Sequence, residues 1–356
     1  MNYHTALDVS LRSVSICIVD DEGAIQFEAK VPSEVEEIVA CLKRFSPEIN
    51  SVGFEAGALT QYLTYGFQAA GYEVICLEAR QVSVTLSAMR NKTDKNDARG
   101  IARILRTGWY SRVHVKSMES HLIRALLSGR KTALKKCVDL ENEIRGLIRL
   151  PGIKLPGPLK HGAYDALVRQ AVEEHACMVS TLIPLLDARL VLYKTYLKLD
   201  NQVKALVRED AICQRLMTVP GVGAITALTF KVGVDDPGRF KSSRTVAAHF
   251  GLTPRRYQSG EVDNPGRISK AGDPDVRSAL YLAAHALVTR SEEWSLLKVW
   301  GIRLIKTKGR KRAVIAVARK LAVILHRMWL DGEAVAHTVR GEYAPGFWEC
   351  VSQGSS

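Results

Sequence analysis

YHTALDVSLRSVSICIVD, residues 3–20, is the stretch that decides the fold of the N-terminal part of the chain. Two runs within it, 3–9 and 13–20, are rich in apolar and β-branched residues and predict adjacent β-strands. The polar DDEG that follows predicts a turn into a third strand at residues 24–31. The first strand closes with a carboxylate, Asp8, so an acidic side chain is expected at a strand end.

Helices and strands alternate in the segment that follows. The apolar patterns predict, in chain order, a helix at 35–45, a strand at 51–55, a helix at 59–71 and a strand at 72–78. Three strands joined as hairpins, followed by alternating helices and strands, indicate an α/β domain with a mixed sheet.

A long helical arm is predicted after the α/β domain. Apolar residues recur at helical spacing from about Met118, and a Pro/Gly-rich break at 151–162 separates them from a second helical run at 164–210. Two amphipathic helices joined by a loop indicate an antiparallel arm or coiled coil. Such an arm either spaces two domains or supports dimerisation.

The C-terminal region begins near Cys213 and is predicted to be mainly helical. VPGVGAITA, residues 219–227, has the pattern of a helix-hairpin-helix-like motif, whose glycines let backbone N–H groups approach a phosphate. A plain turn between two packed helices explains it equally well. We therefore expect four parts: 1–112, 113–211, 212–332 and a tail at 333–356.

The charge balance favours a nucleic-acid partner. The chain has 356 residues, and 50 Lys and Arg against 37 Asp and Glu leave a net charge of +13. That excess favours a polyanion, with nucleic acid ahead of an anionic membrane surface. No apolar run reaches the roughly 20 residues of a spanning helix, and no secretion signal is evident at the start. We expect no membrane partner.

The seven cysteines point to a reducing compartment. They are scattered singly without a Cys-x-x-Cys pair, which argues against a zinc ribbon and a disulfide framework. We expect most of them to be small buried side chains in a cytoplasmic protein.

Four acids form the first candidate site. Asp8 and Glu55 end predicted strands, and Asp94 and Asp97 lie one helical turn apart at a helix start. Strand ends of this kind open onto the crevice where α/β sheets bind ligands. Two hydrated Mg²⁺ ions that act on a phosphodiester require such gathered oxygen ligands, so this is the ligand plan of an RNase-H/RuvC-like nuclease core.

The acidic pair has a plainer explanation. Asp94 is a candidate N-cap for the helix at 95–105, with Asp97 in the first turn complementing the helix dipole. The lysines that flank the pair, Lys92 and Lys95, suit an approaching phosphate backbone, although a solvated helix start also tolerates them.

A serine among arginines forms the second candidate site. Ser259, in a Gln-Ser-Gly step, is a possible nucleophile on phosphorus, with nearby cations stabilising the phosphate oxygens. Residue chemistry alone favours a polar turn, and Tyr257 and Ser269 are competing hydroxyls. Asp273 is a plausible N-cap for the helix that follows. The cations expected to bind nucleic acid in this half of the chain are Arg255, Arg256, Arg267, Lys270, Lys306, Lys308, Arg310, Lys311 and Arg312.

Five segments together carry a resemblance that covers nearly the whole chain. They are ALDVS (6–10), GFEAG (53–57), KTDKNDARGIA (92–102), VPGVGAITA (219–227) and GLTPRRYQSGEVDNPGRISKAGDPDVRSAL (251–280). In this order they resemble the DEDD transposases of bacterial insertion sequences, which are related to the Piv/MooV DNA invertases. Some members are described as bridge-RNA-guided recombinases.

The resemblance implies a fold and a chemistry. It implies a RuvC-like N-terminal domain, a helical coiled-coil arm and a C-terminal transposase domain. Its acidic positions fall on Asp8, Glu55, Asp94 and Asp97, as ligands of Mg²⁺ with Mn²⁺ as a substitute, and its serine nucleophile falls on Ser259. The implied partners are donor and target DNA, a structured noncoding bridge RNA, and further copies of the chain in a dimer or tetramer at the bacterial nucleoid.

Two further functions compete with RNA-guided recombination through a phosphoserine. One is a RuvC-like junction nuclease or resolvase that hydrolyses DNA at the metal site alone. The other is a non-catalytic nucleic-acid scaffold. An ATP-using protein of the actin-like fold is disfavoured, because the phosphate-binding glycine segments it needs are not evident.

Overall fold

The computed structural model describes residues 3–45, 49, 51–89, 91–157, 159–259 and 262–332. The chain divides into two compact units, Met1–Met118 and Glu119–Ser356. The expected tail at 333–356 lies outside the described residues. The four-part division of the chain stays a prediction.

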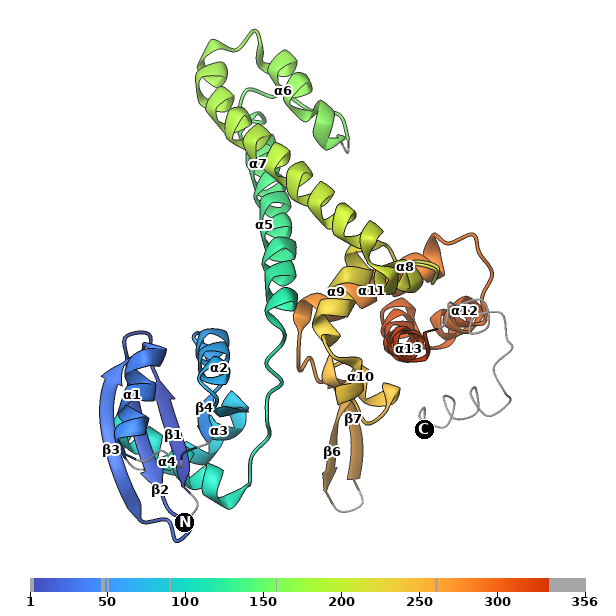
Figure 1. Ribbon diagram of the computed structural model, residues 1–356. Helices are drawn as coiled ribbons and strands as arrows, with labels where there is room; N and C mark the ends of the chain where they lie inside the picture. Colours follow the sequence, from blue (N-terminus) through green and yellow to red (C-terminus); the bar gives the residue numbers. More distant parts are fainter. Residues whose placement is uncertain are drawn as a thin grey trace. The chain divides into compact units, whose positions relative to one another are not determined.

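A five-stranded mixed sheet forms the centre of the first unit (Figure 1). Its strands lie in the order β3-β2-β1-β4-β5. The pairs β1–β2 and β2–β3 are antiparallel, whereas β1–β4 and β4–β5 are parallel, so the predicted mixed sheet is confirmed. The strands are β1 His4–Val9, β2 Ser13–Val19, β3 Ile25–Pro32, β4 Ser51–Glu55 and β5 Glu73–Leu77.

Alternation of side chains along β1 and β4 gives each face of the sheet its own helices. Leu7 and Phe54 belong to a buried cluster with residues of α1 (Val35–Phe45) and α2 (Thr60–Ala69). Ala6, one position earlier, belongs to a second cluster with residues of α3 (Ala79–Leu86) and α4 (Asp94–Thr107). Residues at positions of the same parity as Ala6, which include Asp8, therefore lie on the α4 face.

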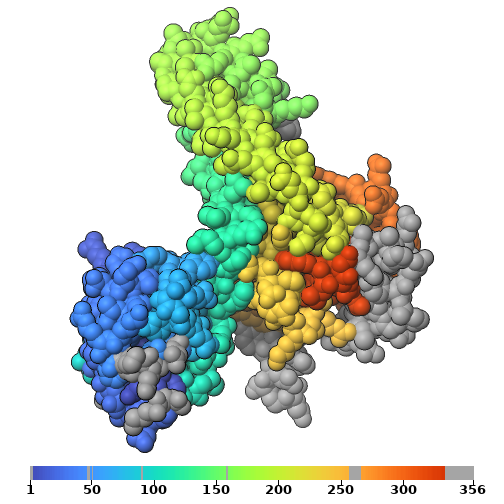
Figure 2. Space-filling model, viewed as in Figure 1, coloured from blue at the N-terminus to red at the C-terminus, as the bar shows by residue number. Residues whose placement is uncertain are grey.

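Two long antiparallel helices begin the second unit, α5 (Met118–Leu147) and α7 (Ala176–Glu209). Arg130 of α5 pairs with Asp200 of α7 at 2.6 Å, and further along α5 Glu141 pairs with Arg189 of α7 at 2.6 Å. The two helices therefore run in opposite directions. The turn η1 (His161–Ala163) and the short helix α6 (Tyr164–Val172) close the tip, which is one packed body in Figure 2. Whether this arm is a coiled coil stays a prediction.

The expectation that no segment is long and apolar enough to span a membrane does not hold for α7, whereas the expected absence of a membrane partner stays a prediction. Helix α7 is long and apolar enough, by length and composition, to cross a membrane. Two charged residues, Asp187 and Arg189, interrupt its apolar run. Both charges are paired, Asp187 with Arg169 at 2.6 Å and Arg189 with Glu141, and Leu182 and Leu186 are buried against α6. One such helix is weak evidence for a membrane.

The rest of the second unit is mainly helical around one large core. A two-stranded antiparallel hairpin, β6 (Pro254–Ser259) with β7 (Val262–Ile268), projects from it (Figure 1). Asp273 caps α11 through the backbone N–H groups of Asp275 and Val276, as predicted. The other elements are α8 Ala211–Leu216, α9 Ala224–Val234, η2 Pro237–Arg239, α10 Ser243–His249, α11 Pro274–Thr289, α12 Leu296–Lys308 and α13 Arg310–Asp331.

Gly221 and Gly223 in the turn between α8 and α9 have different roles. Gly221 has φ of +85°, and a Cβ atom there would lie 2.6 Å from the carbonyl oxygen of Ala283 in α11. A Cβ on Gly223 would meet nothing within 4 Å. Packing against α11 therefore accounts for Gly221, and close approach to a phosphate stays a prediction for Gly223 alone.

Most cysteines in the described ranges are small buried side chains, as predicted, whereas Cys41 is partly buried and Cys177 is exposed. Cys17, Cys76, Cys137 and Cys213 are buried, and all six cysteines in the described ranges are free thiols. Burial raises the pKa of Cys213 to about 12, which makes its thiol unreactive.

Candidate active site

The carboxyl ends of two parallel strands bring Asp8 and Glu55 together. Ala6 and Leu7 of β1 pair with Gly53 and Phe54 of β4, and this register continued by one residue sets Asp8 beside Glu55. Asp8 shares the α4 face with Ala6, and Gly53 packs against α4, because a Cβ on it would meet Leu105. Both acids therefore belong to the side of the sheet that α4 covers.

Helix α4 adds Asp94 and Asp97 in its first turn. The predicted N-cap role of Asp94 is wrong. Thr93 is the N-cap, its hydroxyl accepting from the backbone N–H of Asn96 at 3.2 Å, and Asp94 is the first helical residue. Thr93 has the extended backbone of a cap residue, and its short hydroxyl reaches the third N–H of the helix. Asp94 is thereby released from capping.

Electrostatics show that the four acids share one region. The pKa of Asp8 is raised from 3.8 to about 6, first by burial and then by the negative charges of Asp97, Asp94 and Glu55, in that order. Burial also raises the pKa of Glu55, and Asp97 adds to that rise. Four carboxylates with unfavourable mutual charge make a donor set of hard oxygens that suits a divalent cation.

Lys30 is a site residue that the sequence did not indicate. Ser15 pairs with Asp8 on one side and with Lys30 on the other, so all three form one row across the sheet. The Lys30 ammonium donates to Asp94 at 2.9 Å and lowers the pKa of that carboxyl. The strand register of β1 to β3 would have been needed to predict that Lys30 lies near Asp94. The spacing of residues in the sequence does not give that register.

The two predicted lysines differ in their contacts. Lys92 lies close enough to Asp8 and Glu55 to oppose the rise in their pKa values. Lys95 instead pairs with Glu28 of β3 at 2.9 Å, next to the bidentate pair of Arg99 with the same carboxylate. Lys92 is therefore the better placed of the two to meet a phosphate at the acids.

The residues of the second candidate site belong to the other unit. Ser259 is the last residue of β6 and pairs through its backbone with Val262 of β7, whereas Gly260 lies outside the described residues. Arg255 donates to the carbonyl oxygen of Ser269 at 3.3 Å. Arg267 and Lys270 are exposed, and the side chain of Arg256 is not among those described.

An exposed basic segment joins the last two helices. Residues 306–312 span the end of α12 and the start of α13, and all of them are exposed. Arg310 contacts the Nε2 atom of His285 at 2.8 Å. The exposed cations of this segment are Lys306, Lys308, Arg310, Lys311 and Arg312.

Another group with metal-ligand chemistry lies in the arm. One ligand atom from each of Cys137, Glu141 and His161 lies within 4.8 Å of the others. However, the buried Arg189 guanidinium already donates to Glu141 at 2.6 and 2.9 Å and to Asp165 at 2.6 Å. Its positive charge already balances the carboxylate of Glu141, so stabilisation of the arm accounts for this group.

Comparison with known proteins relates both units to one family. Residues 5–150 match a family model of DEDD transposases of the IS110 type, and residues 213–298 match the model of the transposase IS116/IS110/IS902 family. The transposase for insertion sequence element IS1111A of Coxiella burnetii is 29% identical over 330 residues, which cover 90% of this chain and 87% of that protein.

Two other relatives differ in how much they cover. A probable family 20 transposase of Pseudomonas aeruginosa is 28% identical over 77% of this chain and 82% of its own length. The pilin gene-inverting protein of Moraxella bovis is 33% identical over 110 residues, which cover 31% of this chain and 34% of that protein.

Proposed function

Because this chain belongs to the IS110 family of DEDD transposases and is a DNA transposase or recombinase, we propose that it recombines DNA through a metal site and a serine nucleophile. The metal ligands proposed are Asp8, Glu55, Asp94 and Asp97, and the proposed nucleophile is Ser259. The observation that carries the proposal is geometric: Asp8 and Glu55 lie at the ends of neighbouring parallel strands, and the charges of Asp97 and Asp94 from the first turn of α4 add to the burial that raises the pKa of Asp8.

The proposed chemistry is phosphoryl transfer. A divalent cation, Mg²⁺ or Mn²⁺ in its place, supplies Lewis-acid stabilisation of the scissile phosphate when bound. Lys92 adds a positive charge beside the acids. The Ser259 hydroxyl attacks phosphorus and loses its proton, an Oγ–P bond forms, and the bond from phosphorus to the leaving deoxyribose oxygen breaks, with that oxygen taking up a proton. The phosphoserine keeps the ester bond for strand exchange, in which a deoxyribose hydroxyl reverses the step.

Substitution of the serine tests the covalent step. We expect Ser259→Ala to abolish both recombination in cells that carry the element and the protein–DNA adduct recovered under denaturing conditions. Tyr257→Phe is the control, and it should retain both. Cleavage that persists in Ser259→Ala without an adduct would instead establish a junction nuclease that uses the metal site alone. Loss of the adduct in Tyr257→Phe would move the nucleophile to Tyr257.

The two proposed centres lie on different compact units of the chain. We propose that they form a composite site between copies of the chain in a dimer or tetramer. Asp8→Ala and Ser259→Ala are each expected to be inactive alone and to restore recombination when mixed, since each retains the centre that the other lacks. A mixture that stays inactive, although both variants assemble with wild-type chain, would place both centres on one copy.

The proposed function also includes guidance by RNA. The family resemblance supports a structured bridge RNA that pairs with donor and target DNA, so that base pairing supplies the specificity. The net charge of +13 is compatible with binding both nucleic acids. RNA that co-purifies with the protein and maps beside its own gene is the expected result. Recombination by RNA-free protein on DNA alone would contradict it.

A further inference from the structure

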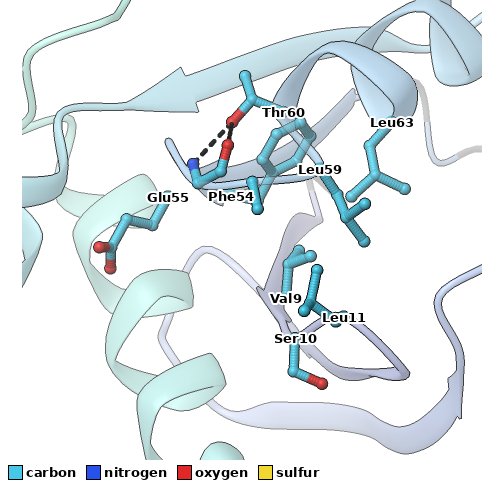
Figure 3. A pocket seen from close by; sticks show the side chains of 10 residues that line it. Val9, Ser10, Leu11, Phe54, Glu55, Leu59, Thr60 and Leu63 are labelled. Atoms are coloured by element: carbon cyan, nitrogen blue, oxygen red, sulfur yellow. Dashed lines mark hydrogen bonds between the residues drawn. The ribbon is translucent and has the colours of Figure 1, made fainter. Parts of the chain in front are cut away.

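A small cavity opens beside the acids, at the carboxyl ends of β1 and β4. It has a volume of about 170 Å³ and lies between the turn after β1 and the loop that leads from β4 into α2. In Figure 3, Val9 and Leu11 face Leu59 and Leu63 across the hollow. We call this cavity the strand-edge pocket. The carboxyl edge of parallel strands is where α/β sheets commonly bind ligands.

The strand-edge pocket and the acids share one residue, Glu55. Glu55 lines the pocket, and Figure 3 shows its carboxylate pointing away from Leu59 and Leu63. Phe54 and Leu63 belong to the core on the α1 and α2 side of the sheet, whereas Asp8 lies on the α4 side. A phosphate held at the acids and a group held in the pocket would therefore lie at the same strand ends, on opposite sides of the sheet, with Glu55 shared between them.

The walls of the strand-edge pocket favour an apolar, uncharged group. Its two hydroxyls are already engaged, since Ser10 donates to the carbonyl oxygen of Ser13 at 2.7 Å and Thr60 donates to that of Gly57 at 2.9 Å. Glu55 at its rim repels anions. Leu11 is 73% exposed, so an apolar side chain stands uncovered at the mouth. A ligand is thus recognised by contact area rather than by hydrogen bonds.

We propose that the strand-edge pocket receives the base of an unpaired DNA nucleotide next to the scissile phosphate. Its volume is well below the roughly 300–1,000 Å³ of sites for drug-sized ligands and suits one planar ring system. Apolar contact with a base face tolerates every sequence, because each base has such a face. The pocket would hold the cleaved strand in place, while base pairing with the guide RNA supplies the sequence specificity. The inference rests on the proposed function.

Methyl resonances of the full chain test the inference. The probe is a short oligothymidylate, compared with an abasic oligonucleotide of the same length, in Ca²⁺ buffer. We expect the methyl signals of Leu11, Leu59 and Leu63 to shift with the base-bearing DNA and not with the abasic one. Equal shifts with both oligonucleotides would overturn the proposal, as would shifts only with the corresponding RNA.

A filling substitution provides the matched control. Ala58 lines the strand-edge pocket and is exposed, so Ala58→Phe should occupy the space without disturbing the core. Ala69→Phe makes the same change at an exposed position at the other end of α2, away from the pocket. We expect Ala58→Phe to weaken binding of the oligothymidylate roughly tenfold and to remove the base-dependent shifts, with Ala69→Phe resembling wild type. Equal affinity of the two variants would contradict the inference.

Manganese separates failure of the pocket from failure of the metal site. The methyl groups of Ala6 and Ala98 lie in the core beneath the acids, so Mn²⁺ bound there should broaden their signals. Broadening without base-dependent shifts would remove the pocket and keep the proposed function. The absence of broadening would instead count against the metal site itself.

Discussion

At the scale of single residues, the candidate site depends on charges whose partners are far away in the sequence. Asp8 is close to acids from β4 and α4, and burial together with their negative charges raises its pKa to about 6. Arg189, in contrast, is fully buried but balanced by Glu141 and Asp165. The first arrangement costs stability until a cation arrives, and the second provides stability on its own.

Replacement of Asp8 should show the cost of the acidic cluster. The folded state raises the pKa of Asp8 above its value of 3.8, so folded protein holds this proton more tightly than unfolded protein. The free energy of unfolding therefore falls as pH rises from about 4 to about 6. We expect Asp8→Asn to raise the free energy of unfolding at neutral pH by about 1–2 kcal/mol, with solvent screening allowed for.

Two conditions check the assignment to Asp8. Chemical denaturation without divalent metal should show the gain shrinking toward zero below about pH 4, where Asp8 is protonated in both states. Addition of Mg²⁺ should stabilise wild type more than Asp8→Asn, because ligand binding to the folded state adds stability. A variant no more stable than wild type at neutral pH would contradict the destabilisation that burial and the neighbouring acids impose on the Asp8 charge.

Arg189 should be among the most sensitive residues of the arm. Arg189→Met leaves the largely buried carboxylates of Glu141 and Asp165 without this counter-charge, and loss of one partner of a buried pair typically costs about 3–5 kcal/mol. Arg169→Met is the control, because its pair with Asp187 is exposed and should contribute less than about 1 kcal/mol. Thermal and urea denaturation of both variants provide the measurement. A similar small loss in both would mean that the buried network does not stabilise the arm.

At the scale of elements, the turn from α8 to α9 separates packing from ligand binding. Gly221 is held in the left-handed region of backbone conformation and against the backbone of α11, whereas Gly223 faces open space at the start of α9. A change in DNA binding without a change in stability is therefore the observation that would connect this turn with phosphates.

The two glycines give opposite expectations. Gly221→Ala should cost roughly 2–4 kcal/mol, because it combines an unfavourable φ with a Cβ atom 2.6 Å from a backbone oxygen. Gly223→Ala should change stability by less than about 0.5 kcal/mol. If the Gly223 backbone approaches a phosphate, its variant binds DNA more weakly at unchanged stability. Unaltered DNA affinity in Gly223→Ala would leave the turn with a packing role only.

At the scale of the whole molecule, some of the positive charges are paired with acids, whereas others are exposed to solvent. Lys95 and Arg99 are paired with Glu28 in the first unit. The segment 306–312 of the second unit, by contrast, is exposed along its whole length and carries five cations. We therefore expect this segment to contribute phosphate contacts that do not depend on base sequence.

Salt titration can detect those contacts. Replacement of Lys306, Lys308 and Lys311 by Gln should weaken binding to unrelated DNA sequences to the same extent. The slope of log affinity against log salt should fall by roughly one for each lysine that contacts a phosphate. The control replaces Lys135, Lys194 and Lys198, three exposed lysines of the arm, and makes the same change in net charge. Equal slopes in the two variants would show that only net charge matters.

The sequence by itself determined the features that depend on near neighbours. Alternating patterns located the five strands, and Asp8 and Glu55 could be placed at strand ends because the ends follow from those patterns. Helix periodicity set Asp94 and Asp97 on one turn. The four acids form one cluster only if their strands are neighbours and parallel. The α/β pattern and the family resemblance both favoured that arrangement.

Tertiary structure alone decided which side chains meet. Thr93 rather than Asp94 caps α4, because cap choice depends on the backbone conformation that the fold imposes at each candidate. Lys30 reaches Asp94 across 64 positions of sequence, and Glu141 meets Arg189 across 48. Such pairs, and the pKa values that follow from them, are set by distance and burial in space, whereas sequence spacing constrains only neighbours along one helix or strand.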